Sequence, residues 1–408
     1  MTQFNLNNLL TCTIDTINQI KNDLDLKIKF VNYKEIEFVI LYNNYYDDDQ
    51  KIQNLKFRKN NNSEYQLICY NFNKIINCDE HKKFKESFEN CSNNYEGYEG
   101  TLINIFFDEK INEWLFTSSR CLDMFKSKFN SNISHGKMFE DVIKKNDIIK
   151  LLDPNNIYAF IIIHHKNKYL VDYTKVFGNN YSKLLYIWTK DKNMNIIDDL
   201  LFKNELEKHE NIIVQKKLNS LKFNENMESI INVSYDDKSK EINIVRIYNS
   251  KYKYLKNIIG NFNTEIERNI YAFQNNNIFE YYTIKKKYDF KVKKQIEILC
   301  KMFDLVSYYI FTYLDDIIKN NKKLDDFNNF KSIKKMLVFL LNMMEKNNKK
   351  FMTKNFILNH LRFYTNPTII YKLFNDFDGY KIPNFDCDKF KFDVDEYFRL
   401  YNYYKSSN

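Results

Sequence analysis

The sequence contains few of the residues that interrupt regular structure. Its 408 residues include six glycines and three prolines, against usual shares of about 7% and 5%. Asn, Lys, Ile, Tyr and Phe are abundant instead, a bias typical of AT-rich coding, so the Asn-rich stretches carry little functional information. Each glycine is informative, because glycine allows a close approach of neighbouring atoms or a left-handed backbone conformation. Four of them lie in segments discussed below: Gly97, Gly100, Gly136 and Gly260.

The sequence also lacks paired cysteines and long apolar runs. Its seven cysteines are widely spaced and form no Cys-x-x-Cys pair, which argues against a disulfide framework or a zinc ribbon. The first residues lack the basic start and apolar run of a signal peptide. No apolar run approaches the roughly 18 residues of a membrane span. We therefore expect a soluble cytoplasmic protein with reduced thiols and no membrane contact.

Positive charge is unevenly placed along the chain. The net charge is +9, and residues 281–350 alone hold 16 lysines and 8 acidic residues, a net charge of +8. A concentrated positive region is the usual footprint of a polyanion such as RNA, because basic side chains release counterions from phosphates. A solvated helical face has the same composition, so both interpretations stay open.

The periodicity of apolar residues predicts an α+β protein with two domains. Between residues 26 and 260, β-branched and aromatic runs broken by polar turns predict antiparallel hairpins, with one helix at 137–152 that ends before Pro154. Beyond a boundary near 262–280 the spacing becomes helical. We expect an antiparallel-sheet domain over 1–262 and an all-helical domain over 263–408, with helices at 291–319, 332–347, 353–364 and 367–377.

The first domain resembles the covalent nucleotidyltransferase superfamily in its phage-type RNA ligase branch, and in particular the ligase-like proteins of large DNA viruses. Arg58 stands near the place of an upstream arginine of that family. No single phrase is specific, and the resemblance rests on order and spacing across residues 50–262. The matching phrases are "ICYNFNKIINCDE" (68–80), "GYEGTL" (97–102), "SSRCLD" (118–123), "YAFIIIHHKNKYLV" (158–171) and "VRIYNSKYKYLKNIIGN" (245–261).

The resemblance implies a fold of ATP-grasp-like antiparallel sheets and a nucleotide site formed by Glu99, Gly100, Arg120 and Arg246. Glu228 is a further candidate remnant of the catalytic set. In that family the lysine of a Lys-x-Asp/Glu-Gly motif attacks the α-phosphate of ATP and forms a lysyl-adenylate. Here position 97 is glycine. Glycine has no amine, so the covalent route is removed at this position.

Other family positions differ as well. Ile161 stands where a carboxylate is usual, Ser229 follows Glu228 where glycine is usual, and the two basic positions of the lysine strand fall at Arg246 and Tyr248. Loss of one preorganised donor to a phosphoryl transition state costs on the order of 10²-fold in rate. We therefore assign no catalytic residue. The sequence favours a protein without enzymatic activity over an enzyme. A displaced lysine, such as Lys82, Lys83, Lys85 or Lys110, remains an alternative, and ATP and Mg²⁺ are expected only in that case.

Three functional classes follow. The leading one is a catalytically degenerate ligase-like module that binds RNA ends or a ribonucleoprotein, in the cytoplasm or in a virion if the protein is viral. The rivals are an active ATP-dependent RNA ligase and a structural subunit with protein partners. Adjacent His164 and His165 are expected on opposite faces of a strand, so no metal site is predicted. The candidate nucleic-acid contacts are Lys285, Lys286, Lys287, Lys291, Lys293 and Lys294.

Overall fold

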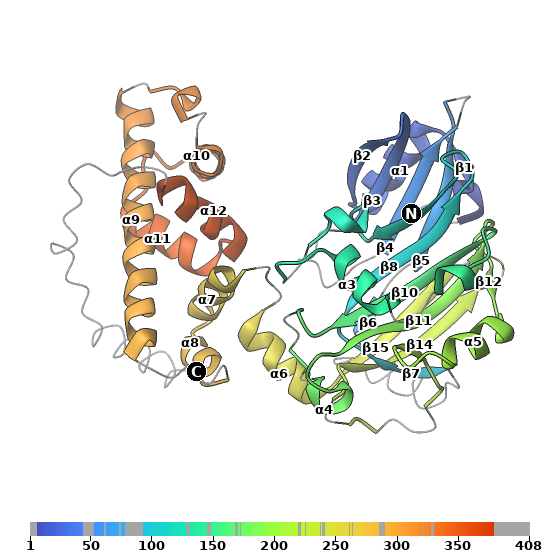
Figure 1. The fold of residues 1–408 in the computed structure, drawn as a ribbon. Helices are drawn as coiled ribbons and strands as arrows, with labels where there is room; N and C mark the ends of the chain where they lie inside the picture. Colours follow the sequence, from blue (N-terminus) through green and yellow to red (C-terminus); the bar gives the residue numbers. More distant parts are fainter. Residues whose placement is uncertain are drawn as a thin grey trace. The chain divides into compact units, whose positions relative to one another are not determined.

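The structure is a computed structural model that divides into two compact units, Met1–Lys253 and Tyr254–Asn408 (Figure 1). It describes residues 6–378 except for the following residues: 44–52, 61–62, 73–74, 78–92, 129–130, 145–147, 168–169, 172, 219–221, 225, 237, 239–240, 261, 263, 285–289, 321 and 328–329. Antiparallel sheets fill the first unit and helices the second, which confirms the predicted α+β class.

An amino-terminal five-stranded sheet has the strand order β1-β5-β4-β3-β2. Helix α1 begins after Thr13, whose side chain accepts a hydrogen bond from the Thr16 N–H and so caps the helix. Strand β3 is apolar and largely buried, and its Phe38 and Leu41 lie in the core. The elements are η1 (Leu6–Leu9), β1 (Thr11–Cys12), α1 (Ile14–Asp23), β2 (Lys27–Tyr33), β3 (Ile36–Tyr42), β4 (Gln53–Lys59) and β5 (Tyr65–Phe72).

A six-stranded sheet has the order β12-β11-β10-β8-β9, with β13 paired in parallel to β11. Phe139 and Val142 of helix α3 pack with Phe160 of the sheet, so this helix covers one sheet face. The strands are β8 (Thr101–Asp108), β9 (Glu113–Ser118), β10 (Asn156–His164), β11 (Ser182–Asp191), β12 (Ile196–Ile197) and β13 (Ile212–Val214). The helices are η2 (Met124–Lys126), α3 (His135–Ile143), η3 (Ile148–Leu151), α4 (Thr174–Phe177) and α5 (Leu200–Glu207).

A four-stranded sheet with the order β6-β15-β14-β7 completes the first unit. Its residues Ile242 and Ile244 pack with Ala159 and Trp188 of the six-stranded sheet, so the two sheets share an apolar layer. This arrangement positions the candidate site, because side chains on the inner face of β14 and β15 point towards that layer. The strands are β6 (Ile75–Asn77), β7 (Asn94–Gly97), β14 (Ser229–Asp236) and β15 (Glu241–Tyr248).

The carboxy-terminal part of the described chain is helical, as expected. Pro367 is the first residue of its helix, where its fixed φ and missing N–H are tolerated. Thr264 and Glu267 form a capping box at the start of α7. The elements are α6 (Ser250–Ile259), α7 (Glu265–Gln274), α8 (Ile278–Ile284), α9 (Phe290–Asn320), η4 (Leu324–Phe327), α10 (Lys331–Lys346), α11 (Lys354–Phe363) and α12 (Pro367–Asp378).

One predicted helix differs from the structure. The sequence predicts a helix over 137–152, whereas α3 begins at His135, because the Ser134 side chain caps it, and ends at Ile143. Residues Ile148–Leu151 form a separate 3-10 turn. Cys12, Cys69, Cys121 and Cys300 are free thiols. Within the described residues, no helix combines the length and the apolar character that a membrane crossing requires.

Candidate functional site

Three residues form one row across the four-stranded sheet. Gly97 of β7 pairs with Ser229 of β14, and Ser229 pairs with Tyr248 of β15. Alternate residues of a strand share a face, and Ile231 and Ile244 of these strands pack in the layer against the six-stranded sheet. The side chains of Ser229, Tyr248 and Arg246 therefore lie on the face that looks towards the six-stranded sheet.

Gly97 and Ser229 are in direct steric contact. A Cβ atom on residue 97 would lie 2.0 Å from Ser229 Oγ and 3.1 Å from the Ser229 carbonyl oxygen. Ser229 is fully buried, and its hydroxyl has no hydrogen-bond partner among the described residues. Where the resembled family has lysine and glycine, this chain has glycine and serine, and the serine side chain fills the space beside residue 97.

Glu228 and Arg246 lie together at the same end of this sheet. Arg246 Nη1 lies 3.6 Å from Glu228 Oε1, and both side chains are mostly buried. The Arg246 guanidinium lies 4.3 Å above the ring of Tyr248, which stacks on Tyr252 at 5.4 Å. Burial, together with the charges of Glu228 and Glu99, raises the pKa of the Tyr252 phenol well above its usual value. Glu228, Arg246, Tyr248 and Tyr252 are therefore neighbours at this end of the sheet.

Glu99 is bound to the backbone. Its Oε2 accepts hydrogen bonds from the N–H of Leu170 at 2.6 Å and of Val171 at 3.3 Å. The Glu99 N–H donates to the Tyr173 hydroxyl at 2.6 Å. Hydrogen bonds from two amides favour an ionised carboxylate. Glu99 therefore fixes the segment that follows β10, a structural role that the sequence did not predict.

Gly100 is required by a close approach of β10. A Cβ atom there would lie 2.2 Å from Ile161 Cγ2 and 2.7 Å from the Ile162 carbonyl oxygen. Ile161 is the position at which the resembled family has a carboxylate. An apolar side chain in contact with the glycine therefore replaces a charged one beside the site.

Arg120 lies in the turn after β9, and its side chain contacts the end of β3. Its Nη2 donates to the carbonyl oxygen of Asn43 at 3.0 Å, and its guanidinium lies 5.1 Å from the ring of Tyr42. These contacts bind the turn after β9 to the end of β3. The proposed nucleotide role of Arg120 stays a prediction, and the contacts that the structure gives it are structural.

A hydrogen-bonded chain of Ser118, Ser127 and His135 lies close in sequence to Arg120. The Ser118 hydroxyl donates to Ser127 Oγ at 3.1 Å, and Ser127 Oγ lies 3.0 Å from His135 Nδ1. Burial lowers the pKa of His135 to about 4, so the ring is neutral at pH 7. Ser118 and His135 are buried. This series of hydrogen bonds holds the end of β9 against the start of α3. The sequence alone does not predict this connection, because no local pattern joins Ser118, Ser127 and His135.

The expectation that His164 and His165 point to opposite faces is wrong. His164 ends β10 and His165 begins a turn, so strand alternation stops between them. The two rings stack at 4.5 Å. His164 Nε2 lies 3.5 Å from Asp141 Oδ2, and burial, then His165, lower the pKa of His164 to about 4. Among the described residues, no group of three His, Cys, Asp or Glu side chains could hold a metal ion.

The lysines that the sequence suggested for nucleic-acid binding are only partly placed. Lys285, Lys286 and Lys287 lie outside the described residues. Lys291, Lys293 and Lys294 lie in the first turns of α9, where the description covers the backbone and not their side chains. Their role stays a prediction.

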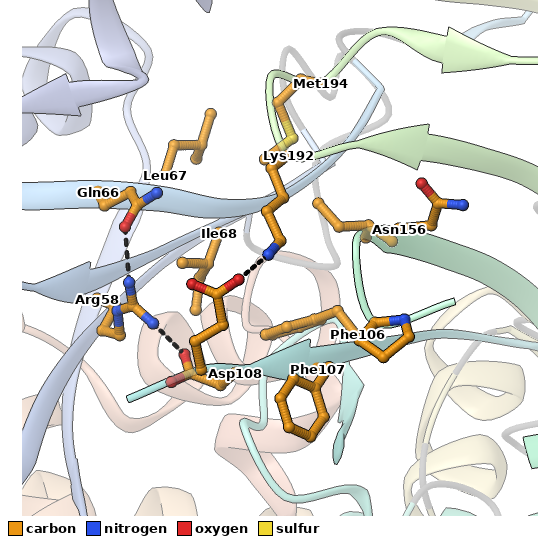
Figure 2. A pocket seen from close by; sticks show the side chains of 13 residues that line it. Arg58, Gln66, Leu67, Ile68, Phe106, Phe107, Asp108, Asn156, Lys192 and Met194 are labelled. Carbon is orange, nitrogen blue, oxygen red and sulfur yellow. Dashed lines mark hydrogen bonds and ion pairs between the residues drawn. The ribbon is translucent and has the colours of Figure 1, made fainter. Parts of the chain in front are cut away.

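A small pocket of about 80 Å³ lies between β4, β5, β8 and the turn after β11 (Figure 2). Its lining does not include Gly97, Ser229 or Tyr248. Arg58 Nη1 lies 2.9 Å from Asp108 Oδ2, and Arg58 Nη2 donates to Gln66 Oε1 at 2.7 Å. Lys192 pairs with Glu109 at the same pocket. Two positive and two negative groups line it, so the pocket selects for neither charge. Arg58, which sequence analysis placed near a family arginine, thus belongs to a buried ion pair.

Comparisons with known proteins identify structural similarity alone. No family model matches the chain, and no curated protein matches it in sequence. The chain is similar to a solved structure titled archaeal ATP-dependent RNA ligase, form 1, with a TM-score of 0.38 and 10% identity, over 67% of this chain and 68% of that one. Form 2 matches with a TM-score of 0.35 and 12% identity, over 63% and 64% of the two chains.

Proposed function

We propose that this chain is an RNA-ligase-like protein that does not adenylate itself and that works by binding RNA ends or a ribonucleoprotein. The observation that carries the proposal is the Gly97–Ser229 pair. In the motif that the sequence resembles, residue 97 would be the amine that attacks ATP. Here it has no side chain, and the space for one is occupied.

The occupied space makes the loss more than a single substitution. A lysine at residue 97 would place its Cβ 2.0 Å from the Ser229 hydroxyl oxygen, far closer than two non-bonded heavy atoms approach. Ser229 is fully buried and β14 is paired on both sides, and the carbonyl oxygen and Cβ of Ser229 would also lie 3.1 and 3.2 Å from the new Cβ. Both strands have therefore adapted to a glycine, and an enzyme that uses this position would need changes in both.

The remaining charged groups of the site bind other parts of the protein, which supports a structural role for them in place of a catalytic one. The Glu99 carboxylate accepts two backbone amides, and Glu228 lies beside Arg246. Electrostatic catalysis needs donors aimed at the charge that develops in the transition state. Here the charges are directed at the protein itself, which supports stability rather than phosphoryl transfer.

Three described lysines, Lys110, Lys56 and Lys190, are poorly placed to substitute for the missing amine. Lys110 follows β8, whose far end is roughly 23 Å along the strand from Thr101 at about 3.3 Å per residue, and Lys110 Nζ donates to the Lys59 carbonyl oxygen at 3.5 Å. Lys56 and Lys190 are fully buried. Lys82, Lys83 and Lys85 lie outside the described residues. Adenylation of a lysine at another position is therefore left to experiment.

The RNA partner is argued from charge. Residues 281–350 have a net charge of +8, and a polyanion gains affinity from the counterions that such a region releases. The order of motifs in the first unit resembles a family that acts on RNA. Together these features favour RNA over a neutral protein partner.

Two measurements test the proposal. Incubation with labelled ATP and Mg²⁺ followed by a denaturing gel should give no labelled protein band, and a band that disappears with one lysine substitution would overturn the non-adenylating part. RNA affinity measured with a 5′-labelled oligonucleotide should fall steeply with added salt. Absent or salt-insensitive binding would favour a structural subunit instead.

A further inference from the structure

Four aromatic rings form a cluster on helices α10 and α11, with His360 in contact with each of the other three. Phe356, His360 and Tyr364 follow one another at every fourth residue, so they share one face of α11 and its end. Ring centroids are 6.4 Å apart for Phe356 and His360, 5.8 Å for His360 and Tyr364, and 5.1 Å for Phe339 of α10 and His360. The rings of each pair lie within 27° of parallel. We call these four residues the aromatic stack.

Two rings of the aromatic stack are exposed, and the other two are half-buried. Tyr364 is 78% exposed and Phe339 is 46% exposed, and Phe351 and Phe363 nearby are also exposed. The buried residues of the same helices are aliphatic side chains and methionines: Ile333, Met336, Leu337, Leu340 and Met344 on α10, and Ile357 and Leu361 on α11. A cluster of exposed apolar rings beside a complete core marks an interaction surface.

The segment that carries the stack is rich in positive charge. Residues 331–364 contain seven lysines and Arg362, against one acidic residue, Glu345. Lys335 and Lys346 are exposed and lie at four residues before and seven residues after Phe339, so all three share one face of α10. Lys349 Nζ lies 5.2 Å from the ring of Phe356. Lys334 and Lys354 pair with Asp325 and Asp304.

Exposed aromatic rings beside exposed lysines match one kind of ligand well. Proteins that bind single-stranded nucleic acid combine a basic track for the phosphates with aromatic side chains on which successive bases stack. In a duplex the base faces are covered by neighbouring bases, so only an unpaired strand can use the rings. An apolar protein partner would explain the rings but not the excess of lysine.

We propose that the face formed by the aromatic stack with Lys335, Lys346 and Lys349 binds a single-stranded polynucleotide. Bases stack on Tyr364 and Phe339, the two most exposed rings of the stack, and phosphates lie along the lysines. The inference rests on the proposed RNA-binding function and adds to it the surface, the strandedness and the mode of recognition. It also moves the expected contacts from the start of α9 to α10 and α11.

The test uses the full chain and fluorescence anisotropy with labelled U12 RNA, dT12 DNA and a blunt RNA duplex. The double variant Phe339→Ala/Tyr364→Ala should bind both single strands at least 10-fold more weakly at every salt concentration, because one stacked base is worth about 1–3 kcal/mol. Its slope of log affinity against log salt should not change. The RNA and DNA arms report which sugar the surface prefers.

The double variant Lys335→Gln/Lys346→Gln should instead change the salt dependence of binding. Each lost phosphate contact lowers the salt slope by about 0.7 for a single strand, so the slope should fall by about 1.4. Phe30→Ala is the matched control, because Phe30 is also an exposed aromatic residue and lies beside the exposed Lys29 in the first unit. Its affinity should equal that of the wild type.

The outcomes separate the two proposals. If the wild type binds single strands and Phe339→Ala/Tyr364→Ala binds them equally well, the surface is wrong while the RNA-binding function stands. If the wild type binds no nucleic acid, both proposals fail. Equal binding of the duplex would exclude stacking. Tyr364→Ala alone, at the most exposed ring, repeats the test if the double variant does not fold.

Discussion

Gly97 and Ser229 face each other across the antiparallel pair of β7 and β14, and the serine hydroxyl occupies the position that a side chain on residue 97 would need. The two positions look like independent departures from a resembled motif when the sequence is read alone. In the fold they are one contact. A substitution at either position therefore changes the cost of a substitution at the other, which connects the proposed loss of adenylation to a measurable stability effect.

The first prediction concerns this coupling. Gly97→Ala should lower the free energy of unfolding of the first unit by about 1–3 kcal/mol, because it overpacks a filled site. Ser229→Gly alone should cost less, since the buried hydroxyl that it removes has no partner among the described residues. The double variant should recover most of the loss of Gly97→Ala, a non-additivity expected for residues in contact.

Urea denaturation followed by tryptophan fluorescence measures this effect in the right unit. Trp114 and Trp188 are the only tryptophans of the chain, and both lie in the first compact unit. The helical unit therefore contributes no tryptophan signal. If the destabilisation of the double variant equals the sum of the two single-variant values, the contact between residues 97 and 229 does not cause the loss of stability in Gly97→Ala.

The second prediction concerns a buried lysine. Lys190 Nζ donates to the carbonyl oxygens of Tyr70 at 2.6 Å and Asn71 at 2.9 Å, and burial lowers its pKa to about 7. The unfolded value is about 10.4, so between pH 7 and about 10 the unfolded chain holds the proton that the folded chain has lost. Stability should therefore rise with pH through this window.

Between pH 7 and pH 9 the Lys190 contribution should amount to about 2 kcal/mol. Lys190→Met should remove that part of the rise, and the difference between the two tryptophan-monitored pH profiles isolates it. Lys27→Met, at an exposed position of β2, is the control and should leave the profile unchanged. Parallel profiles of wild type and Lys190→Met would contradict the assignment.

The third prediction concerns the ion pair of Figure 2. Arg58 and Asp108 are 9% and 1% exposed in their side chains, and Asp108 Oδ1 also accepts from the N–H groups of Lys110 and Ile111. Asp108→Asn keeps the shape but leaves a buried guanidinium without its carboxylate. It should destabilise the first unit by about 3 kcal/mol, the range for breaking a buried pair.

Removing both charges should cost less than removing one. Asp108→Asn/Arg58→Met should therefore be more stable than Asp108→Asn in the same tryptophan-monitored denaturation, because the uncompensated charge is gone. A double variant less stable than both single variants would mean that hydrogen bonding to Gln66, rather than the charge pair, dominates at this pocket.

Local patterns predicted much of the architecture. Alternating β-branched residues marked the strands, and three-and-four spacing marked α9 to α12, because each pattern follows from the geometry of its own element. The helix at 137–152 was predicted too long, since the capping role of Ser134 and the end at Ile143 depend on hydrogen bonds that periodicity does not encode. Helix α1 and the short helices after β15 were not predicted.

The candidate site was predictable by residue type and not by arrangement. Glu99, Glu228 and Arg246 were selected from motif order. The structure pairs Glu228 with Arg246, whereas Glu99 binds the backbone amides of Leu170 and Val171. Arg120 was selected in the same way, and its described contacts are with Tyr42 and Asn43. The aromatic stack was missed, because Phe339 belongs to a different helix from the other three rings.

By itself, the sequence determined the α+β class, the change from strands to helices, the basic character of the second half and the absence of an amine at position 97. Those properties belong to single residues or to short periodic segments. The tertiary structure alone decided that Ser229 fills the space beside Gly97, that Lys190 loses its solvent, and that Phe339 joins the rings of α11. Each of these depends on residues distant in sequence being brought together by packing, and local periodicity carries no information about such partners.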